Sequence, residues 1–336
     1  MKIIIPLAGH GKRLRPHTYS QPKPLLPVAG KAVLGHIMDE LSVLDIEEII
    51  FIVSDRGNQI EEYMKANYPQ YTTRYALQDR MLGQSYGVNA ARPYIEQGEV
   101  LIIFSDTVFK TDLASLSQVE ADGVLHLREV PDPARFGVAV VNTEGFVTRL
   151  VEKPATPVSN LAIVGVYYFK EADRLFGAIE KQLNSGLQLN GEYFLADAIT
   201  LLLEEGARFQ ARSLTLWEDC GTIPALLESN RHLLAAMPHV KEHSSPDYTV
   251  IPPVYIAPDA KIDRSIIGPY ASIGSGVQVI NSIVSDSIIN DHSYITSSIL
   301  TGSVIGRNTV ITGKPKRLNI GDDCLLEFNF EAAGTD

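Results

Sequence analysis

Short apolar runs alternate along the first 110 residues with segments whose apolar residues recur every three or four positions. The apolar runs, each a predicted strand, occupy 3–7, 48–53 and 100–104, and a further short strand is predicted at 73–77. The segments with helical spacing occupy 33–44, 59–67 and 87–95. Strands that are apolar throughout and separated by helices are typical of a parallel sheet covered on both faces. The pattern therefore predicts an α/β domain whose ligands bind at the carboxyl ends of its strands.

From residue 123 to residue 169 the pattern changes to strands joined by turns. The predicted strands occupy 138–141, 147–151 and 164–169, and the first two flank a hairpin turn at 142–145. Further helices are predicted at 171–183, 194–205 and 225–236. The segment 237–247 has little periodicity and is predicted to be a linker.

An internal repeat follows the linker, in which an aliphatic residue recurs every five or six positions. Its members are Ile256, Ile262, Ile267, Ile273, Val279, Val284, Ile289, Ile295, Leu300, Ile305 and Ile311. No helix has that period, and a β-sandwich with irregular strands would not keep the step so regular. A hexapeptide β-helix fits, because each short strand places one aliphatic side chain inside the coil. The predicted domains are residues 1–240 and 248–336.

The composition is ordinary for a globular protein, with 336 residues, 45% hydrophobic and 21% charged. A net charge of −11 argues against nucleic acid or an anionic membrane as a partner. The two cysteines, Cys220 and Cys324, have no paired spacing, which favours a reducing cytoplasm over a disulfide framework or a zinc site. No apolar run approaches the roughly 20 residues of a membrane helix, and we expect no signal peptide.

Positive charge is concentrated at the amino end of the chain. The first 38 residues carry six Lys or Arg, and no acidic residue precedes Asp39. Several of these cations follow Gly9-His10-Gly11, where the backbone can turn tightly and approach a ligand. Such an arrangement favours a pocket for several phosphates, bound by amides and neutralised by cations. The alternative is a turn with a solvated basic face.

Two known phosphate-binding motifs do not fit this segment. The dinucleotide fingerprint needs a third glycine where the chain has Leu14, and no Walker Gly-Lys-Ser/Thr occurs at the right spacing. Pro22 and Pro24 do favour a functional role, because they fix the backbone on both sides of Lys23 and hold its ammonium group in place.

The run Leu7-Ala8-Gly9-x-Gly11-x-Arg13-Leu14, followed by Pro-Lys-Pro-Leu-x-Pro-Val at 22–28, resembles the signature of sugar-1-phosphate nucleotidyltransferases. The glucose-1-phosphate thymidylyltransferase group, in its longer form, matches best. This resemblance implies a Rossmann-like, GT-A-like α/β domain with a mixed sheet, followed by a left-handed parallel β-helix. It implies nucleotide binding by Leu7, Ala8, Gly9 and Gly11. It also implies catalytic roles for Arg13 and Lys23. Lys12 stands where the family usually has threonine, and the Gly-x-Gly spacing is shorter than in most members.

A magnesium site is implied by two further segments. Phe104-Ser105-Asp106 ends a predicted strand, and Trp217-Glu218-Asp219-Cys220-Gly221-Thr222 resembles the second metal segment of the family. The resemblance implies that Asp106 and Asp219 hold one Mg²⁺, an ion that prefers few carboxylates together with phosphate oxygens and water. Ser105 departs from the usual glycine, and Cys220 fits a packing role better than a nucleophilic one.

The nucleobase and the sugar have their own matching segments. Gln78 and Gly83 resemble the base-reading loop Gln-x-x-x-x-Gly, and a carboxamide suits the N3–H and O4 edge of uracil or thymine. The residues matching the sugar-binding segments are Gly137, Glu152, Lys153, Val164 and Gly165. Of these, Lys153 is also expected to hold the sugar phosphate. Residues 191–197, Gly-Glu-Tyr-Phe-Leu-Ala-Asp, match another family segment.

The resemblance implies an enzyme of nucleotide-sugar biosynthesis that converts a nucleoside triphosphate and a sugar 1-phosphate into a sugar nucleotide and pyrophosphate. We expect dTTP or UTP and glucose 1-phosphate as substrates. We also expect a homo-oligomer built on β-helix edges and the 225–236 helix. Because the repeat has its own interior, a chain ending near residue 239 is expected to keep the catalytic core.

Three alternatives remain at this point. One is guanylyl transfer to mannose 1-phosphate. Another is a non-catalytic regulatory subunit that binds sugar nucleotides, which the departures at Lys12, Ser105 and Ala196 keep open. The third is acyl transfer by the β-helix. It has little support, since His292 is the only histidine after residue 243 and about four coils is short for that role.

Overall fold

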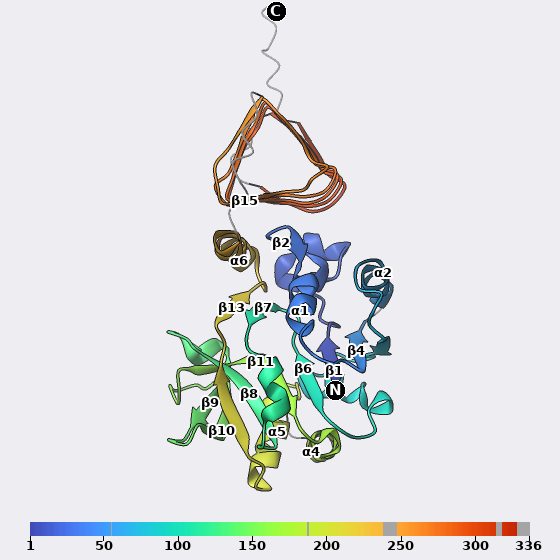
Figure 1. The fold of residues 1–336 in the computed structure, drawn as a ribbon, viewed down its shortest axis with the longest axis vertical. Coiled ribbons are helices and arrows are strands. Elements are labelled where there is room, and N and C mark those ends of the chain that lie inside the picture. Colours follow the sequence, from blue (N-terminus) through green and yellow to red (C-terminus); the bar gives the residue numbers. More distant parts are fainter. Residues whose placement is uncertain (55, 187, 238–246, 314–317, 328–336) are drawn as a thin grey trace, which may run out of the picture. The chain divides into compact units, whose positions relative to one another are not determined.

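The computed structural model describes residues 1–336 except 55, 187, 238–246, 314–317 and 328–336 (Figure 1). By their internal contacts, the described residues form two compact units. The first is Met1–Gly9 with His36–Trp217, and the second is His10–Gly35 with Glu218–Asp336. The predicted division splits the chain once, near residue 240. In the structure, the basic segment 10–35 instead groups with the carboxyl-terminal part of the chain. Most of the predicted linker, 237–247, lies outside the described residues.

A nine-stranded mixed sheet forms the first unit, in the order β5-β4-β1-β6-β11-β8-β12-β10-β9. Its strands are β1 (Lys2–Pro6), β4 (Glu48–Val53), β5 (Thr73–Leu77), β6 (Val100–Ile103), β8 (Gly123–Glu129), β9 (Gly137–Val141), β10 (Phe146–Glu152), β11 (Leu161–Phe169) and β12 (Phe209–Ser213). The four strands β5, β4, β1 and β6 are parallel, as predicted from their continuous apolar runs. β11 joins them antiparallel, which confirms the mixed sheet.

One end of this sheet closes on itself. β11 pairs with β6 over Val166–Phe169, and beyond a register shift it pairs with β9 through Ala162 and Val138. Gly165 lies in the shift with φ +81°, a conformation that L side chains rarely adopt. Because β11 changes partner there, the strands β11, β8, β12, β10 and β9 form a closed ring of pairings. The chain was expected to form strands here, but not this closure.

Helices cover the sheet of the first unit. Their bounds are α2 (Gly57–Asn67), α3 (Gln84–Asn89), α4 (Ala172–Ser185) and α5 (Leu195–Glu204), and α1 (Val33–Leu41) precedes β4. Ile4, Ile50 and Ile102 are register partners on β1, β4 and β6, and they pack with residues of α3, α4 and α5 in one buried cluster. The helix predicted at 87–95 instead begins at Gln84 and ends at Asn89. A 3₁₀ turn at Arg92–Tyr94 follows, because Pro93 lacks an N–H and disfavours helix before it.

His126 is a polar residue on the otherwise apolar strand β8, and its side chain is fully buried. Its Nδ1 lies 3.2 Å from the carbonyl oxygen of Val166. Its Nε2 has no hydrogen-bond partner among the described residues. Burial lowers the pKa of this imidazole to about 4, so the folded protein holds it neutral.

This buried histidine makes stability depend on pH. Unfolded chains bind a proton at His126 near pH 6.5, but the folded protein does so only near pH 4. We therefore expect the free energy of unfolding to fall by roughly 3 kcal/mol from this group as the pH drops through that window. Urea unfolding between pH 7.5 and pH 4.5 measures the loss. His126→Asn, whose amide can still donate to Val166, should lose less, and equal losses in both proteins would refute the assignment.

The basic segment, α6 (Ile223–Ala236) and the β-helix form the second unit. The segment has little regular structure beyond three 3₁₀ turns at Lys12–Leu14, His17–Tyr19 and Lys23–Leu25. It then forms a short hairpin of β2 (Pro27–Val28) and β3 (Lys31–Ala32). β13 (Leu216–Asp219) leads the chain from the first unit back into the second. The remaining elements of the first unit are β7 (Thr107–Lys110) and short 3₁₀ turns at Ala114–Gln118 and Pro133–Arg135.

Three stacks of parallel strands make the β-helix, whose coils have a triangular outline in Figure 1. The strands are β14 (Tyr248–Val250), β15 (Val254–Ile256), β16 (Lys261–Asp263), β17 (Ser265–Ile267), β18 (Ala271–Ile273), β19 (Gln278–Ile280), β20 (Ile283–Ser285), β21 (Ile288–Ile289), β22 (Tyr294–Thr296), β23 (Ile299–Thr301), β24 (Val304–Ile305), β25 (Val310–Thr312), β26 (Asn319–Ile320) and β27 (Leu325–Glu327). The predicted aliphatic ladder fills the interior, from Ile267 to Ile311 fully buried, with Ile256 and Ile262 partly buried against it. The stacks are consistent with the left-handed β-helix expected from the resemblance.

Within the part of the chain that the structure describes, no helix is both long enough and apolar enough to cross a bilayer.

Candidate active site

The predicted site residues fall into both units, and the second unit contains Gly11 with the cations that follow it. Gly11 has φ +59°, and a Cβ there would lie 2.9 Å from the Thr18 methyl carbon and 3.2 Å from Cβ of Lys23. The Thr18 hydroxyl donates to the Gly11 carbonyl at 2.9 Å. Only glycine suits this position, and its turn brings the stem of Lys23 against the start of the segment.

Arg13 and Asp219, predicted from separate motifs, both lie beside Gly221. A Cβ on Gly221 would lie 2.8 Å from Oδ1 of Asp219 and 3.4 Å from Nη2 of Arg13. The Gly221 N–H donates to that same carboxylate oxygen at 2.7 Å, and the Ser229 hydroxyl donates to the Asp219 carbonyl at 2.8 Å. The Gly221 N–H therefore orients the carboxylate, Ser229 of α6 holds the backbone of the same residue, and the Arg13 guanidinium lies nearby.

In the first unit, Asp106 follows β6 at the carboxyl end of the parallel strands. Its neighbour Ser105 donates a hydrogen bond to the Pro6 carbonyl of β1 at 2.9 Å. Phe104 donates its N–H to the Gly165 carbonyl at 2.8 Å, and a Cβ on Gly165 would lie 3.0 Å from Cβ of Phe104. The structure thus brings together the end of β1, the metal-segment aspartate and the bend of β11.

The predicted base loop joins the segment 191–197. Gly83 has φ +103°, and a Cβ there would lie 2.6 Å from the backbone nitrogen of Tyr193. The Tyr193 N–H donates to the Leu82 carbonyl at 2.8 Å, and Ser85 donates its N–H to the Tyr193 carbonyl at 3.0 Å. The Gln78 amide donates to the Arg80 carbonyl at 2.9 Å, so it is turned onto its own loop.

Gly137, Glu152 and Lys153 form one cluster, as the sugar-segment prediction requires. Gly137 and Glu152 are paired across β9 and β10, and a Cβ on Gly137 would lie 2.6 Å from Oε2 of Glu152. The Lys153 ammonium lies 3.7 Å from Oε1 of Glu152 and 4.6 Å from the centre of the Phe194 ring. This cation is therefore directed back toward the 191–197 segment.

Asp197 and Tyr167, to which the sequence-based prediction gave no role of their own, take part in the electrostatics of this cluster. Burial raises the pKa of the Glu152 carboxyl, Lys153 opposes that shift and Asp197 adds to it. Burial likewise raises the pKa of Asp197. Tyr167 is buried on β11, and its pKa is raised by burial and then by the charges of Glu152 and Asp106. A tyrosine inside an apolar strand gives no sequence signal of such a role.

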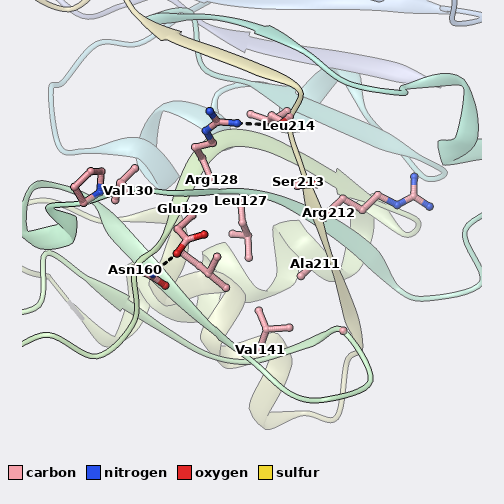
Figure 2. Close-up of a pocket in the computed structure, with 13 residues that line it drawn as sticks. Leu127, Arg128, Glu129, Val130, Val141, Asn160, Ala211, Arg212, Ser213 and Leu214 are labelled. Atoms are coloured by element: carbon pink, nitrogen blue, oxygen red, sulfur yellow. Dashed lines mark hydrogen bonds between the residues drawn. The ribbon is translucent and has the colours of Figure 1, made fainter.

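A separate pocket opens within the closed ring of strands (Figure 2). Its volume is about 980 Å³, and its walls come mainly from β8, β9, β11 and β12. At its rim the Asn160 amide donates to Glu129 at 2.6 Å, and Arg128 donates to the Leu214 carbonyl at 3.3 Å. None of the predicted site residues lines this pocket, so it is not the predicted site.

The donor set suits magnesium better than a metal held wholly by protein. Among the described residues there is no group of three or more His, Cys, Asp or Glu that could hold a metal ion. A pair of carboxylates is a sufficient protein contribution for Mg²⁺, which takes its other ligands from phosphates and water. Asp106 and Asp219 each offer one carboxylate, which is the ligand type that this ion prefers.

Comparison with known proteins identifies close relatives of most of the chain. Residues 2–236 match the family model described as nucleotidyl transferase. The chain is 30% identical to the low-salt glycan biosynthesis nucleotidyltransferase Agl11 of Haloferax volcanii, over 98% of this chain and 100% of that one. It is also 30% identical to a glucose-1-phosphate thymidylyltransferase of Streptomyces antibioticus, over 93% of this chain and 94% of that one.

Among solved structures, one of UDP-glucose pyrophosphorylase complexed with UDP-glucose superposes with a TM-score of 0.62. It covers 70% of this chain and 99% of that one, at 21% identity. At that identity the likeness speaks for the fold alone.

Proposed function

The chain belongs to the nucleotidyl transferase family, and we propose that it transfers a nucleotidyl group from dTTP or UTP to glucose 1-phosphate. The products are the sugar nucleotide and pyrophosphate. The observation that carries this proposal is the clustering in the first unit of Gly137, Glu152 and Lys153, where the Lys153 ammonium lies 3.7 Å from Oε1 of Glu152 and Gly137 pairs with Glu152 across two strands. The relative named as a glucose-1-phosphate thymidylyltransferase, similar over nearly the whole chain, supports the choice of substrates.

The reaction needs no nucleophilic side chain, because the acceptor supplies the nucleophile. An oxygen of the sugar phosphate attacks the α-phosphorus in line, the bond to the bridging oxygen of pyrophosphate breaks, and pyrophosphate leaves with the electron pair. We assign Arg13 and Lys23 to the charge of the triphosphate and Lys153 to the sugar phosphate. Positioning and charge neutralisation then supply the rate enhancement.

We assign Asp106 and Asp219 as the protein ligands of Mg²⁺. The bound ion would neutralise phosphate charge and favour departure of pyrophosphate. The hydrogen bond from Gly221 to Oδ1 holds Asp219 in one orientation. Glu152 and Gly137 are assigned to the sugar, since the carboxylate accepts from hydroxyl groups and the missing Cβ leaves room beside it.

The proposal is tested by pyrophosphate release over a grid of nucleotides and acceptors. The grid combines dTTP, UTP and GTP with glucose 1-phosphate and mannose 1-phosphate, with a parallel arm containing acetyl-CoA. We expect release with dTTP or UTP and glucose 1-phosphate. Preference for GTP with mannose 1-phosphate would overturn the substrates, and no release with any pair would overturn the activity.

Gln78 is assigned to the nucleobase. Its carboxamide offers one acceptor and one donor, matching N3–H and O4 of thymine or uracil, whereas guanine presents two donors to a carboxylate. We expect Gln78→Glu to weaken use of dTTP and UTP by about 1–3 kcal/mol in kcat/KM, with GTP weakened less or improved.

The matched control is Gln84→Glu, which adds the same charge six positions on and keeps the acceptor for the Leu195 N–H at 3.2 Å. Values of kcat/KM for the three nucleotides are compared in all three proteins. An equal decrease for every nucleotide in Gln78→Glu would show that this side chain does not read the base.

A further inference from the structure

Asn230 is a fully buried amide on α6 that connects the basic segment to the β-helix. Its Oδ1 accepts from the Ala29 N–H at 2.8 Å and from the Ser272 hydroxyl at 2.7 Å. Its Nδ2 donates to the Tyr270 carbonyl at 3.1 Å. One side chain therefore forms hydrogen bonds with the β2–β3 hairpin turn and with two residues of the β-helix.

The same hairpin turn packs on an aromatic ring of the first coil. Ala29 and Gly30 both have positive φ, at +48° and +80°. A Cβ on Gly30 would lie 2.4 Å from the ring of Tyr255 on β15, so only a glycine can approach the ring this closely. The turn is thus anchored by a hydrogen bond to Asn230 and by close contact with Tyr255.

A second anchor ties the basic segment to the last coils. Nε2 of His17 lies 2.7 Å from Oδ1 of Asn319, and the Ser20 hydroxyl donates to the carboxylate of Asp322. His17 is 3% exposed, burial lowers its pKa, and its Nε2–H donates to the amide oxygen of Asn319. A Cβ on Gly321 would lie 3.1 Å from Cβ of Pro16.

The two anchors flank Lys23 in the sequence, one at residues 16–20 and the other at 29–30. Lys23 and Thr18 in turn pack at Gly11, two positions before Arg13. We propose that the β-helix positions this cationic segment for the nucleotide, with Asn230 and Asn319 as positioning residues. The role in nucleotide use rests on the proposed function, whereas the anchoring of the segment does not.

This inference runs against the expectation that a chain ending near residue 239 would keep the catalytic core. Such a chain would lose Tyr255, Ser272 and Asn319 together. Before α1 begins at Val33, the segment from residue 10 has only three 3₁₀ turns and one hairpin of two-residue strands, so its conformation depends on these partners.

The test compares Asn230→Ala and Asn319→Ala with Ser282→Ala in the full chain. Ser282 is as buried as Ser272, but it bonds only within the β-helix, donating to the Ile280 carbonyl and accepting from the Ser298 N–H. It controls for general weakening of the coils. Hydrogen exchange followed by mass spectrometry reports directly on residues 10–35 and needs no substrate.

We expect exchange in 10–35 to accelerate at least tenfold in Asn230→Ala around Ala29 and in Asn319→Ala around His17, but not in Ser282→Ala. KM for the nucleotide should rise about tenfold or more in both anchor variants, with KM for the sugar phosphate within about twofold. Asn230→Asp keeps the acceptor for the Ala29 N–H. Its increases in exchange rate and in nucleotide KM should therefore be smaller than those of Asn230→Ala.

Unchanged exchange and unchanged nucleotide KM in a folded Asn230→Ala and Asn319→Ala would overturn the inference. If Asn230→Ala does not fold, Asn319→Ala and Ser272→Ala decide it by the same readouts. If the wild type releases no pyrophosphate with any substrate pair, the proposed function fails, and the exchange measurement still decides whether the β-helix anchors the segment.

Discussion

Asp106→Asn and Asp219→Asn are each expected to slow nucleotidyl transfer by roughly 10²–10⁴-fold, equivalent to about 3–5 kcal/mol of transition-state stabilisation. An amide carries no charge and is a weaker ligand for a hard cation than a carboxylate. The Asn at position 219 can still accept from the Gly221 N–H, which now bonds Oδ1 of Asp219 at 2.7 Å. The fold should therefore be kept while the metal ligand is lost.

The measurement is kcat/KM over a titration of Mg²⁺, with thermal unfolding as a check on folding. Asp173→Asn serves as the control, because Asp173 is an exposed residue in the first turn of α4. Rates near the wild-type value for both site variants at every Mg²⁺ concentration would refute the metal assignment. A defect that excess Mg²⁺ partly restores would support it.

Arg13→Ala is expected to lower kcat/KM by about 10²–10³-fold, the usual effect of removing one preorganised group that stabilises transition-state charge. Arg13→Lys should retain part of the activity, since an ammonium keeps the charge but not the forked donor geometry that suits phosphate. The guanidinium lies near Gly221, next to the carboxylate assigned to the metal. Because the Arg13 side chain is exposed, its removal should affect the reaction without removing a core contact.

Arg15 provides the control within the same segment. It is also exposed, and its guanidinium lies 4.8 Å from the centre of the Tyr19 ring. Arg15→Ala removes the same charge two positions away and is expected to change kcat/KM much less. Equal losses in Arg13→Ala and Arg15→Ala would mean that the net charge of the segment matters, and not the placement of Arg13.

The sequence by itself determined most of the buried strands and the β-helix, because buried positions recur along the chain with a period that can be read from the sequence. Glu48–Val53 and Thr73–Leu77 are strands with the predicted bounds. In Glu48–Val53 the signal is clear, since a strand buried on both faces is apolar at consecutive positions. The aliphatic step of five or six residues likewise fills the β-helix interior as predicted. The motif residues were found from their order and spacing, and the family match over residues 2–236 confirms the family they indicated.

The tertiary structure alone decided which distant parts are partners. Ala29 and Asn230 are 201 positions apart, and His17 and Asn319 are 302 apart. Single polar contacts of this kind leave no periodic trace, so nothing along the chain assigns the basic segment to the β-helix unit. The change of partner at Gly165 was equally hidden, because it depends on how strands register in space and not on the pattern within a strand.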